Sequence, residues 1–90
     1  MTSRARIVVT GLVQGIGYRY FAHTHGRMLG LSGFARNLID GSVEIEAQGE
    51  RSQIERFVGE LRAGPSGAVV SDVSVDWIAT EPGSQGFAIL

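Results

Sequence analysis

Hydrophobic and polar positions follow two periods along the chain, which predict strands and helices in turn. The run 6–10 is short and rich in β-branched residues, which is typical of a strand. From 18 to 29 the apolar positions recur every three or four residues, which predicts a helix that ends at Gly30. Strict alternation returns over 42–47 and predicts a strand with one buried face and one solvated face.

Asp40-Gly41 predicts a hairpin. This dipeptide lies between strand-like runs over 33–39 and 42–47, where Asp-Gly strongly favours a tight turn. A later strand is expected over 71–80, where valines alternate with polar residues. The apolar tail 87–90 is long enough for a short fifth strand at the edge of the sheet.

The second helix is the clearest element in the sequence. Ser52 and Glu55 have the spacing of a capping box, in which each side chain bonds the other residue's backbone N–H. Apolar residues follow at helical spacing, and Gly64-Pro65 is expected to end the helix. The predicted order is therefore β-α-β-β-α-β, as in ferredoxin-like domains. In this α+β fold, two helices cover one face of a four-stranded antiparallel sheet, and we expect residues 1–90 to form one domain.

Composition excludes several classes of function. The chain has no cysteine and a net charge of −1. It therefore offers no disulfide, no thiolate metal site and no thiol nucleophile, and it has no long-range attraction for nucleic acid or an anionic membrane. The apolar run 7–9 is too short for a signal peptide or a membrane helix. We expect a cytoplasmic protein.

The loop before the first helix contains the parts of a phosphate-binding cradle. Its residues are Gln14, Gly15, Ile16, Gly17, Tyr18 and Arg19. The first N–H groups of a helix lack partners and its dipole favours negative charge, while glycines let successive N–H groups converge on one anion. Arg19 adds a planar fork that matches two phosphate oxygens. Taken alone, this stretch supports an anion site only weakly, because a tight turn with a solvated arginine is the more common explanation of a Gly-x-Gly before a helix.

Two motifs resemble the signatures of the acylphosphatase family. The first is Val9-x-Gly11-x-Val13-Gln14-Gly15-Ile16-Gly17-Tyr18-Arg19. The second is Gly33-Phe34-Ala35-Arg36-Asn37, followed by Gly41-x-Val43 and Gly49. The resemblance covers essentially all 90 residues. Its departures are mild, since Ile16 and Tyr18 stand where valine and phenylalanine are more usual.

The resemblance implies a reaction and a site. Arg19 resembles the arginine that binds phosphate, and Asn37 resembles the asparagine that orients the attacking water. The backbone amides of Gly15, Ile16, Gly17 and Tyr18 would bind the substrate's phosphate beside them. The implied activity is hydrolysis of acyl phosphates to carboxylate and inorganic phosphate, with no metal and no cofactor. We expect a monomer with no nucleic-acid or membrane partner.

Three alternatives remain open at this point. The first is a non-catalytic anion-binding or regulatory module on the same fold. The second is the acylphosphatase-like domain of larger carbamoyl-transfer maturation enzymes, in which a proline typically follows the motif arginine; Tyr20 stands there in this chain. The third is a nucleic-acid-binding ferredoxin-like domain, which charge and missing aromatic motifs disfavour. Asn37 by itself, beside an Asp-Gly turn, is compatible with simple turn chemistry.

Other polar residues are expected to be structural. His23 and His25 are two positions apart on a helix, so they face different directions and do not readily share a metal ion. Glu44 and Glu46 lie on one face of a strand, and we expect that face to be solvated. Trp77 is expected to pack in the core or on the sheet face.

Overall fold

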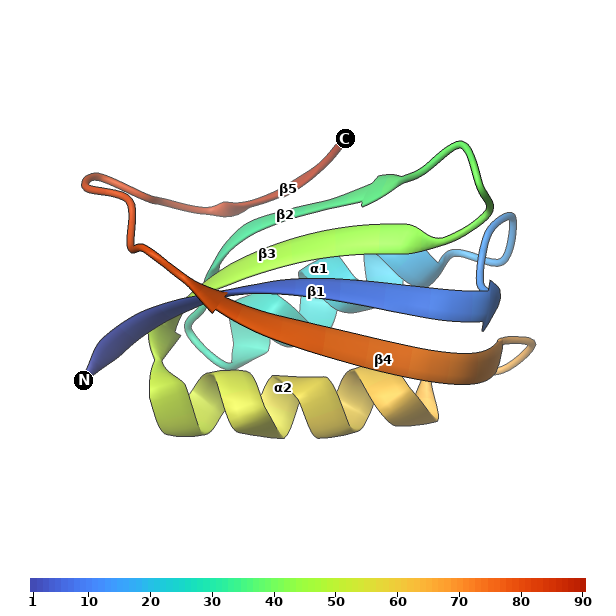
Figure 1. Ribbon diagram of the computed structural model, residues 1–90, viewed down its shortest axis with the longest axis horizontal. Coiled ribbons are helices and arrows are strands. Elements are labelled where there is room, and N and C mark those ends of the chain that lie inside the picture. Colours follow the sequence, from blue (N-terminus) through green and yellow to red (C-terminus); the bar gives the residue numbers. More distant parts are fainter.

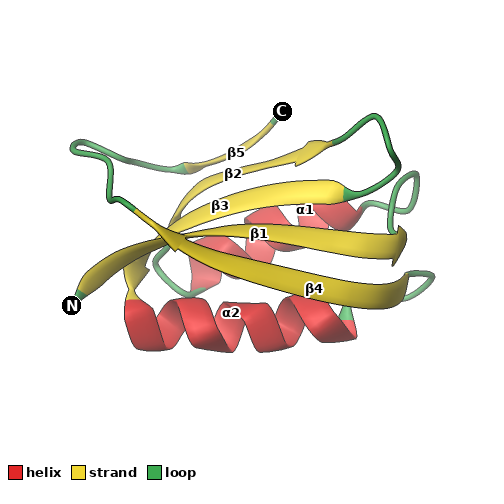
Figure 2. Ribbon diagram, viewed as in Figure 1, coloured by secondary structure: helices red, strands yellow, loops and turns green.

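Two helices lie against one face of a twisted five-stranded sheet in the computed structural model, which describes residues 1–90 (Figures 1 and 2). In chain order the elements are β1 (Thr2–Leu12), α1 (Tyr18–Met28), β2 (Ser32–Asn37), β3 (Val43–Glu50), α2 (Arg51–Ala63), β4 (Val69–Ile78) and β5 (Phe87–Ile89). The predicted β-α-β-β-α-β order and its α+β class are confirmed. Neither helix is long and apolar enough to cross a membrane.

The sheet is mixed. Its strand order is β4-β1-β3-β2-β5, and the first four of these strands pair antiparallel, as predicted. The C-terminal tail forms the expected edge strand, but β5 runs parallel to β2. The last long strand begins at Val69 rather than at position 71, because its pairing with β1 continues past a register shift to Leu12.

The core lies between the helices and the sheet. Ile7 and Ile45 pair directly across the two central strands, and both side chains are fully buried. Phe57 of α2 and Ala22 of α1 are buried against the same face. Alternate residues of each strand therefore face the helices, as the period of the sequence predicted.

Tyr18 ties the two helices together at the end where α1 begins. Its ring is 1% exposed, and its hydroxyl group donates a hydrogen bond of 2.6 Å to the main-chain oxygen of Leu61 in α2. Burial raises the pKa of the Tyr18 phenol. The hydroxyl group, which the more usual phenylalanine lacks, thus has a buried acceptor of its own.

The predicted capping box at the start of α2 is wrong. The helix begins at Arg51, directly after β3, and its N-cap residue is Glu50, with no side-chain capping bond. The cause is tertiary, because β3 stays paired with β1 up to the Thr2–Glu50 pair and runs straight into the helix. The Arg51 N–H donates to the main-chain oxygen of Met1 at 3.2 Å, so backbone replaces the side-chain cap.

The expectation that Glu44 and Glu46 lie on a solvated face is also wrong. The side chain of Glu44 is only 5% exposed, and its carboxylate accepts hydrogen bonds of 2.6 Å from Arg6 and from Arg36. Glu46 accepts a bond of 2.9 Å from Arg4, whose side chain is 4% exposed. Arginines of neighbouring strands thus cover these carboxylates.

Ionisation of Glu44 is coupled to folding. Burial by itself raises the pKa of this carboxyl, but the hydrogen bonds and charges of Arg6 and Arg36 outweigh burial and hold the pKa below its ordinary value of 4.5. A carboxyl whose pKa is lower in the folded protein than in the unfolded chain stabilises the fold at every pH above its ordinary pKa. This contribution is lost as the pH falls through the depressed value.

We therefore predict that Glu44→Gln lowers the free energy of unfolding at neutral pH by about 1–3 kcal/mol, because two arginines lose a charged acceptor. The deficit relative to the native protein should shrink as the pH is lowered past 4.5. Urea denaturation across this range measures both effects. Glu55→Gln, at an exposed partner of Arg51, is the control, with a change within about 0.5 kcal/mol. A deficit for Glu44→Gln that does not depend on pH would contradict the coupling.

Candidate active site

The junction of β1 and α1 forms a loop with left-handed glycines. Gly15 and Gly17 each have a φ of 79°, a conformation that other residues rarely adopt. Gly17 is also the N-cap of α1, and no side chain caps the helix N-terminus. No acidic residue lies in the first helical turn. The first amides of α1 are therefore free of side-chain acceptors and keep the positive end of the helix dipole open to an anion.

A small cavity of about 150 Å³ lies beside this loop. It is lined by Val13, Gly15, Gly17, Tyr18, Arg19, Tyr20, Asn37 and Ile89. The two predicted catalytic residues, Arg19 and Asn37, thus meet at one cavity together with Gly15, Gly17 and Tyr18. Ile16 does not line it; its exposed side chain lines a neighbouring, more open hollow.

Asn37 reaches the cavity because of strand register. It is the last residue of β2 and pairs with Val43, which pairs on its other side with Val9 of β1. These three residues form one row on the helix-facing side of the sheet. The loop that follows β1 and the turn between β2 and β3 accordingly lie side by side at one end of the molecule (Figure 1).

The turn after β2 does not use the Asn37 side chain. Asp40 closes the turn, since its carboxylate accepts hydrogen bonds from the N–H of Ser42 at 3.0 Å and from the Ser42 hydroxyl at 2.5 Å. These bonds hold the pKa of Asp40 below its usual value. The amide of Asn37 makes no hydrogen bond within the protein and remains exposed. Asp40, and not Asn37, therefore makes the side-chain hydrogen bonds that stabilise this turn.

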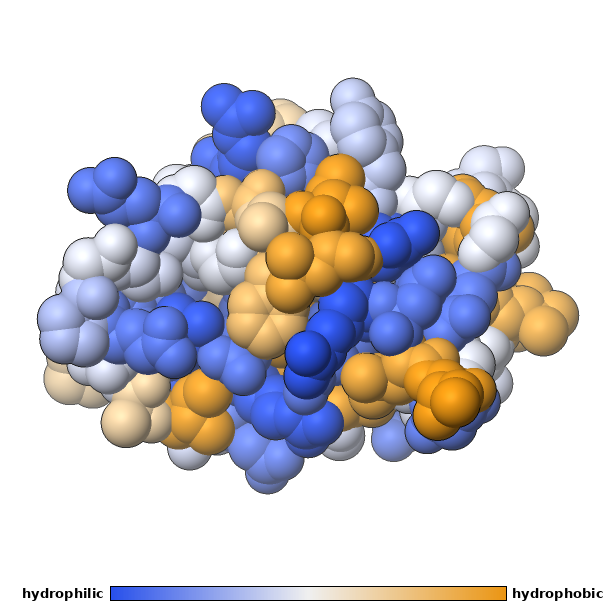
Figure 3. Space-filling view, turned by 90° about the horizontal axis from the view of Figure 1, so that it is seen from above, coloured by the Kyte–Doolittle hydropathy of each residue, from blue (hydrophilic) through white to orange (hydrophobic).

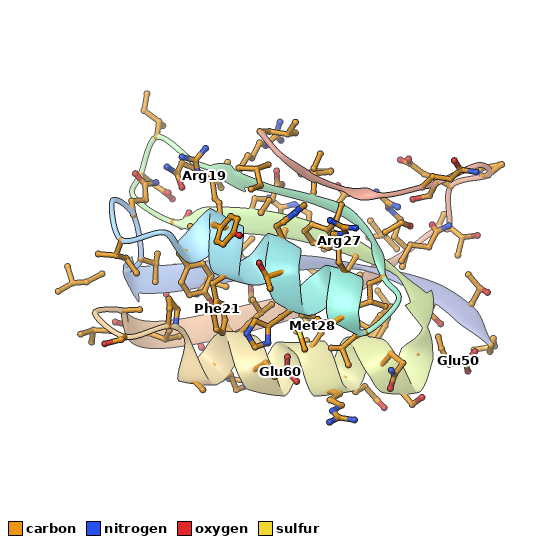
Figure 4. The ribbon with its side chains drawn as sticks, turned by 180° about the vertical axis from the view of Figure 1, so that it is seen from behind. Arg19, Phe21, Arg27, Met28, Glu50 and Glu60 are labelled. Carbon is orange, nitrogen blue, oxygen red and sulfur yellow. The ribbon has the colours of Figure 1, made fainter.

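Arg19 is held by the C-terminal strand region. Its Nη1 donates a hydrogen bond of 2.5 Å to the main-chain oxygen of Leu90, and no carboxylate side chain pairs with it. Figure 4 shows Arg19 at the start of α1, on the side of the helix near β2. The remaining N–H groups of the guanidinium stay available to a ligand. No residue pattern predicts this contact, because a main-chain acceptor carries no residue signature.

The surface around the contact is partly apolar. Ile89 and Leu90 are 43% and 59% exposed, and apolar side chains lie next to strongly hydrophilic ones on the β5 side of the molecule (Figure 3). Ile89 also lines the cavity. The tail therefore contributes both an apolar wall and the acceptor that positions Arg19.

Gln14 is a second residue whose contacts were not predicted. Its Nε2 donates to the main-chain oxygens of Leu38 at 2.8 Å and of Ser42 at 2.9 Å. The side chain thus connects the loop before α1 to the turn after Asn37. The sequence carries no pattern that points to these two main-chain acceptors.

The remaining candidates have structural partners. Nδ1 of His23 lies 2.6 Å from the main-chain oxygen of Phe87, whereas Nδ1 of His25 lies 2.5 Å from a carboxylate oxygen of Glu60. The two imidazoles therefore face different neighbours, as predicted. Trp77 is 39% exposed rather than part of the core, and the guanidinium of an arginine stacks 3.9 Å above its ring.

Comparison with known proteins identifies the family. The family model for acylphosphatase matches residues 5–89. An acylphosphatase of Bifidobacterium longum is 53% identical over 72 residues, which cover 80% of this chain and 74% of the relative. An acylphosphatase of Chlorobaculum tepidum is 40% identical over 87 residues, which cover 97% of this chain and 95% of the relative. The crystal structure of acylphosphatase from Bacillus subtilis superposes with a TM-score of 0.94 at 36% identity, covering 100% of this chain and 99% of that one.

The cavity thus belongs to a small α+β hydrolase that acts on acid anhydrides. The chain belongs to the acylphosphatase family, and its similarity supports hydrolysis of acyl phosphates.

The left-handed glycines give a direct test of the cradle. We predict that Gly17→Ala lowers the free energy of unfolding by about 1–2 kcal/mol, because a Cβ disfavours the φ of 79° although no atom blocks it. The shifted amides should also weaken binding of inorganic phosphate, measured by calorimetry.

Gly59→Ala is the matched control. Gly59 lies within α2, facing open space, so alanine should raise the free energy of unfolding by about 0.5–1 kcal/mol and leave phosphate affinity as it was. Equal phosphate affinity in the two variants would argue against the cradle.

Proposed function

We propose that the protein hydrolyses acyl phosphates in the cavity between the β1–α1 loop and the end of β2. The observation that carries this proposal is the meeting of Arg19 and Asn37, from two separate sequence motifs, in the lining of one cavity of about 150 Å³. Family membership supports the reaction class. The free amide of Asn37 supports catalysis over simple anion binding, because an anion cradle alone does not need it.

In this mechanism the β1–α1 loop and Arg19 hold the phosphoryl group. The backbone N–H groups from Gly15 to Arg19 and the guanidinium donate hydrogen bonds to the phosphoryl oxygens. Their positive charge offsets the negative charge that the oxygens carry in the transition state. The bond from Nη1 to the Leu90 oxygen fixes the guanidinium, so less side-chain freedom is lost when the substrate binds.

Asn37 positions the attacking water in line with the leaving group. Its amide offers an acceptor oxygen and two donor hydrogens, and it does not titrate, so its role is to orient the water. The water oxygen forms a bond to phosphorus as the bond from phosphorus to the acyl oxygen breaks. The electron pair leaves with the carboxylate, and a proton from the water passes to solvent. A carboxylate is a good leaving group, so the step needs neither a strong base nor a metal ion.

We propose further that the protein works as a monomer in the cytoplasm, with no cofactor and with no nucleic-acid or membrane partner. The absence of cysteine suits a reducing compartment, and a net charge of −1 gives no attraction to polyanions.

We predict that Arg19→Ala and Asn37→Ala each lower kcat for benzoyl phosphate by about 10²–10³, the effect of removing one preorganised polar group. The loss of ultraviolet absorbance on hydrolysis measures the rate. The control is Arg27→Ala, which removes an exposed arginine from the far end of the same helix (Figure 4) and should retain native turnover.

The assays are run with chelator present, and native turnover should persist. Two outcomes would contradict the proposal. A folded native protein no faster than buffer would favour a non-catalytic anion-binding module, which phosphate binding by calorimetry would then detect. Turnover abolished by chelator and restored by a divalent ion would contradict the metal-independent mechanism.

A further inference from the structure

Gln14 makes the side-chain contact that joins the two halves of the candidate site. Its Nε2 donates to two main-chain oxygens, those of Leu38 at 2.8 Å and Ser42 at 2.9 Å, across the gap between the β1–α1 loop and the β2–β3 turn. The side chain is half-buried. Each hydrogen of the amide nitrogen therefore has its own acceptor, one at the start and one at the end of the β2–β3 turn.

The two acceptors lie where the β2–β3 turn begins and where it ends. The Leu38 N–H donates to the Ser42 oxygen at 2.8 Å, and the Gly41 N–H donates to the Leu38 oxygen at 3.2 Å. Asp40 closes the turn from the other side through its bonds to Ser42. The turn therefore has its own internal bonds, and Gln14 is an additional link that ties it to the neighbouring loop.

The neighbours of this link are the groups that must meet the substrate. Gly15, the first cradle residue, follows Gln14 directly, and Asn37 directly precedes Leu38. The Gln14 amide thus sets how far the cradle amides lie from the end of β2. A displacement of about 1 Å between reacting groups can cost about 10²-fold in rate.

We propose that Gln14 is a positioning residue for hydrolysis, which holds Asn37 at the distance from the phosphate cradle that in-line attack of water requires. This inference rests on the proposed function. Gln14 does not line the cavity, so its effect passes through Asn37 and the cradle. Phosphate binding depends on groups that all lie on the β1–α1 side of the link, namely the loop amides and Arg19. Loss of the link should therefore affect kcat far more than the affinity for phosphate.

Gln14→Met is the main test, because methionine keeps the length of the side chain and removes both donors. At a temperature where circular dichroism shows the variant folded, kcat for benzoyl phosphate should fall about 10- to 100-fold. KM and the Kd for inorganic phosphate should change less than about three-fold. Gln53→Met is the matched control, since Gln53 is also half-buried and its Nε2 donates to a main-chain oxygen, of Leu29 at 3.5 Å, away from the site. It should keep native kcat.

Gln14→Glu provides a second test with a pH profile. An ionised carboxylate cannot donate to the two carbonyl oxygens, whereas a protonated one can donate a single hydrogen bond. The kcat of this variant relative to the native protein should therefore be low at neutral pH and should rise as the pH falls toward about 4.

The outcomes separate the two proposals. Native kcat in Gln14→Met, even with a lowered Tm, would reduce Gln14 to a structural role and overturn this inference, while the proposed function would stand. A raised KM with unchanged kcat would overturn it too, because it would place Gln14 in phosphate binding. No hydrolysis by the folded native protein would overturn the proposed function and this inference together.

Discussion

The antiparallel pairing of β1 with β3 is the constraint on which the candidate site depends. Val9 pairs with Val43, which pairs with Asn37, so the end of β1 and the end of β2 are fixed on one row of the sheet. A slip of β2 by one residue would turn the Asn37 side chain to the opposite face. Ile45 pairs with Ile7 of β1 on one side and with Ala35 of β2 on the other, and all three are fully buried. This buried row anchors both registers and so positions the site from outside the cavity lining.

Charged side chains pair with one another on the open face of the sheet, whereas Arg19 and Asn37 at the cavity pair with no other side chain. Arg6 and Arg36 share the carboxylate of Glu44, with bonds of 2.6 Å to each. Arg19, in contrast, donates only to a main-chain oxygen, and the amide of Asn37 has no partner in the protein. Groups that are held in place and pair with no other side chain need little reorganisation when a phosphoryl group arrives. Arg19, the arginine proposed to bind the phosphoryl group, thus differs from Arg6 and Arg36, which are paired with a buried carboxylate.

Features with local determinants could be predicted from the sequence. The order of elements follows from periodicity, and the two motifs name Arg19 and Asn37, which the fold brings to one cavity. Features that depend on distant segments could not be predicted. The burial of Glu44 depends on arginines of two other strands, and the capping box at Ser52 was lost because β3 runs directly into α2. The contacts of Gln14 and Arg19 end on main-chain oxygens, which no residue pattern reveals.

In the proposed mechanism, water attacks phosphorus while Arg19 and the loop amides hold the phosphoryl group. Hydrolysis of benzoyl phosphate in water enriched in oxygen-18 tests it directly, with mass spectrometry of both products. The mechanism predicts that the label enters inorganic phosphate and that benzoate stays unlabelled, because the bond between phosphorus and the acyl oxygen is the one that breaks. Label in benzoate would show attack at the carbonyl carbon and would contradict the mechanism.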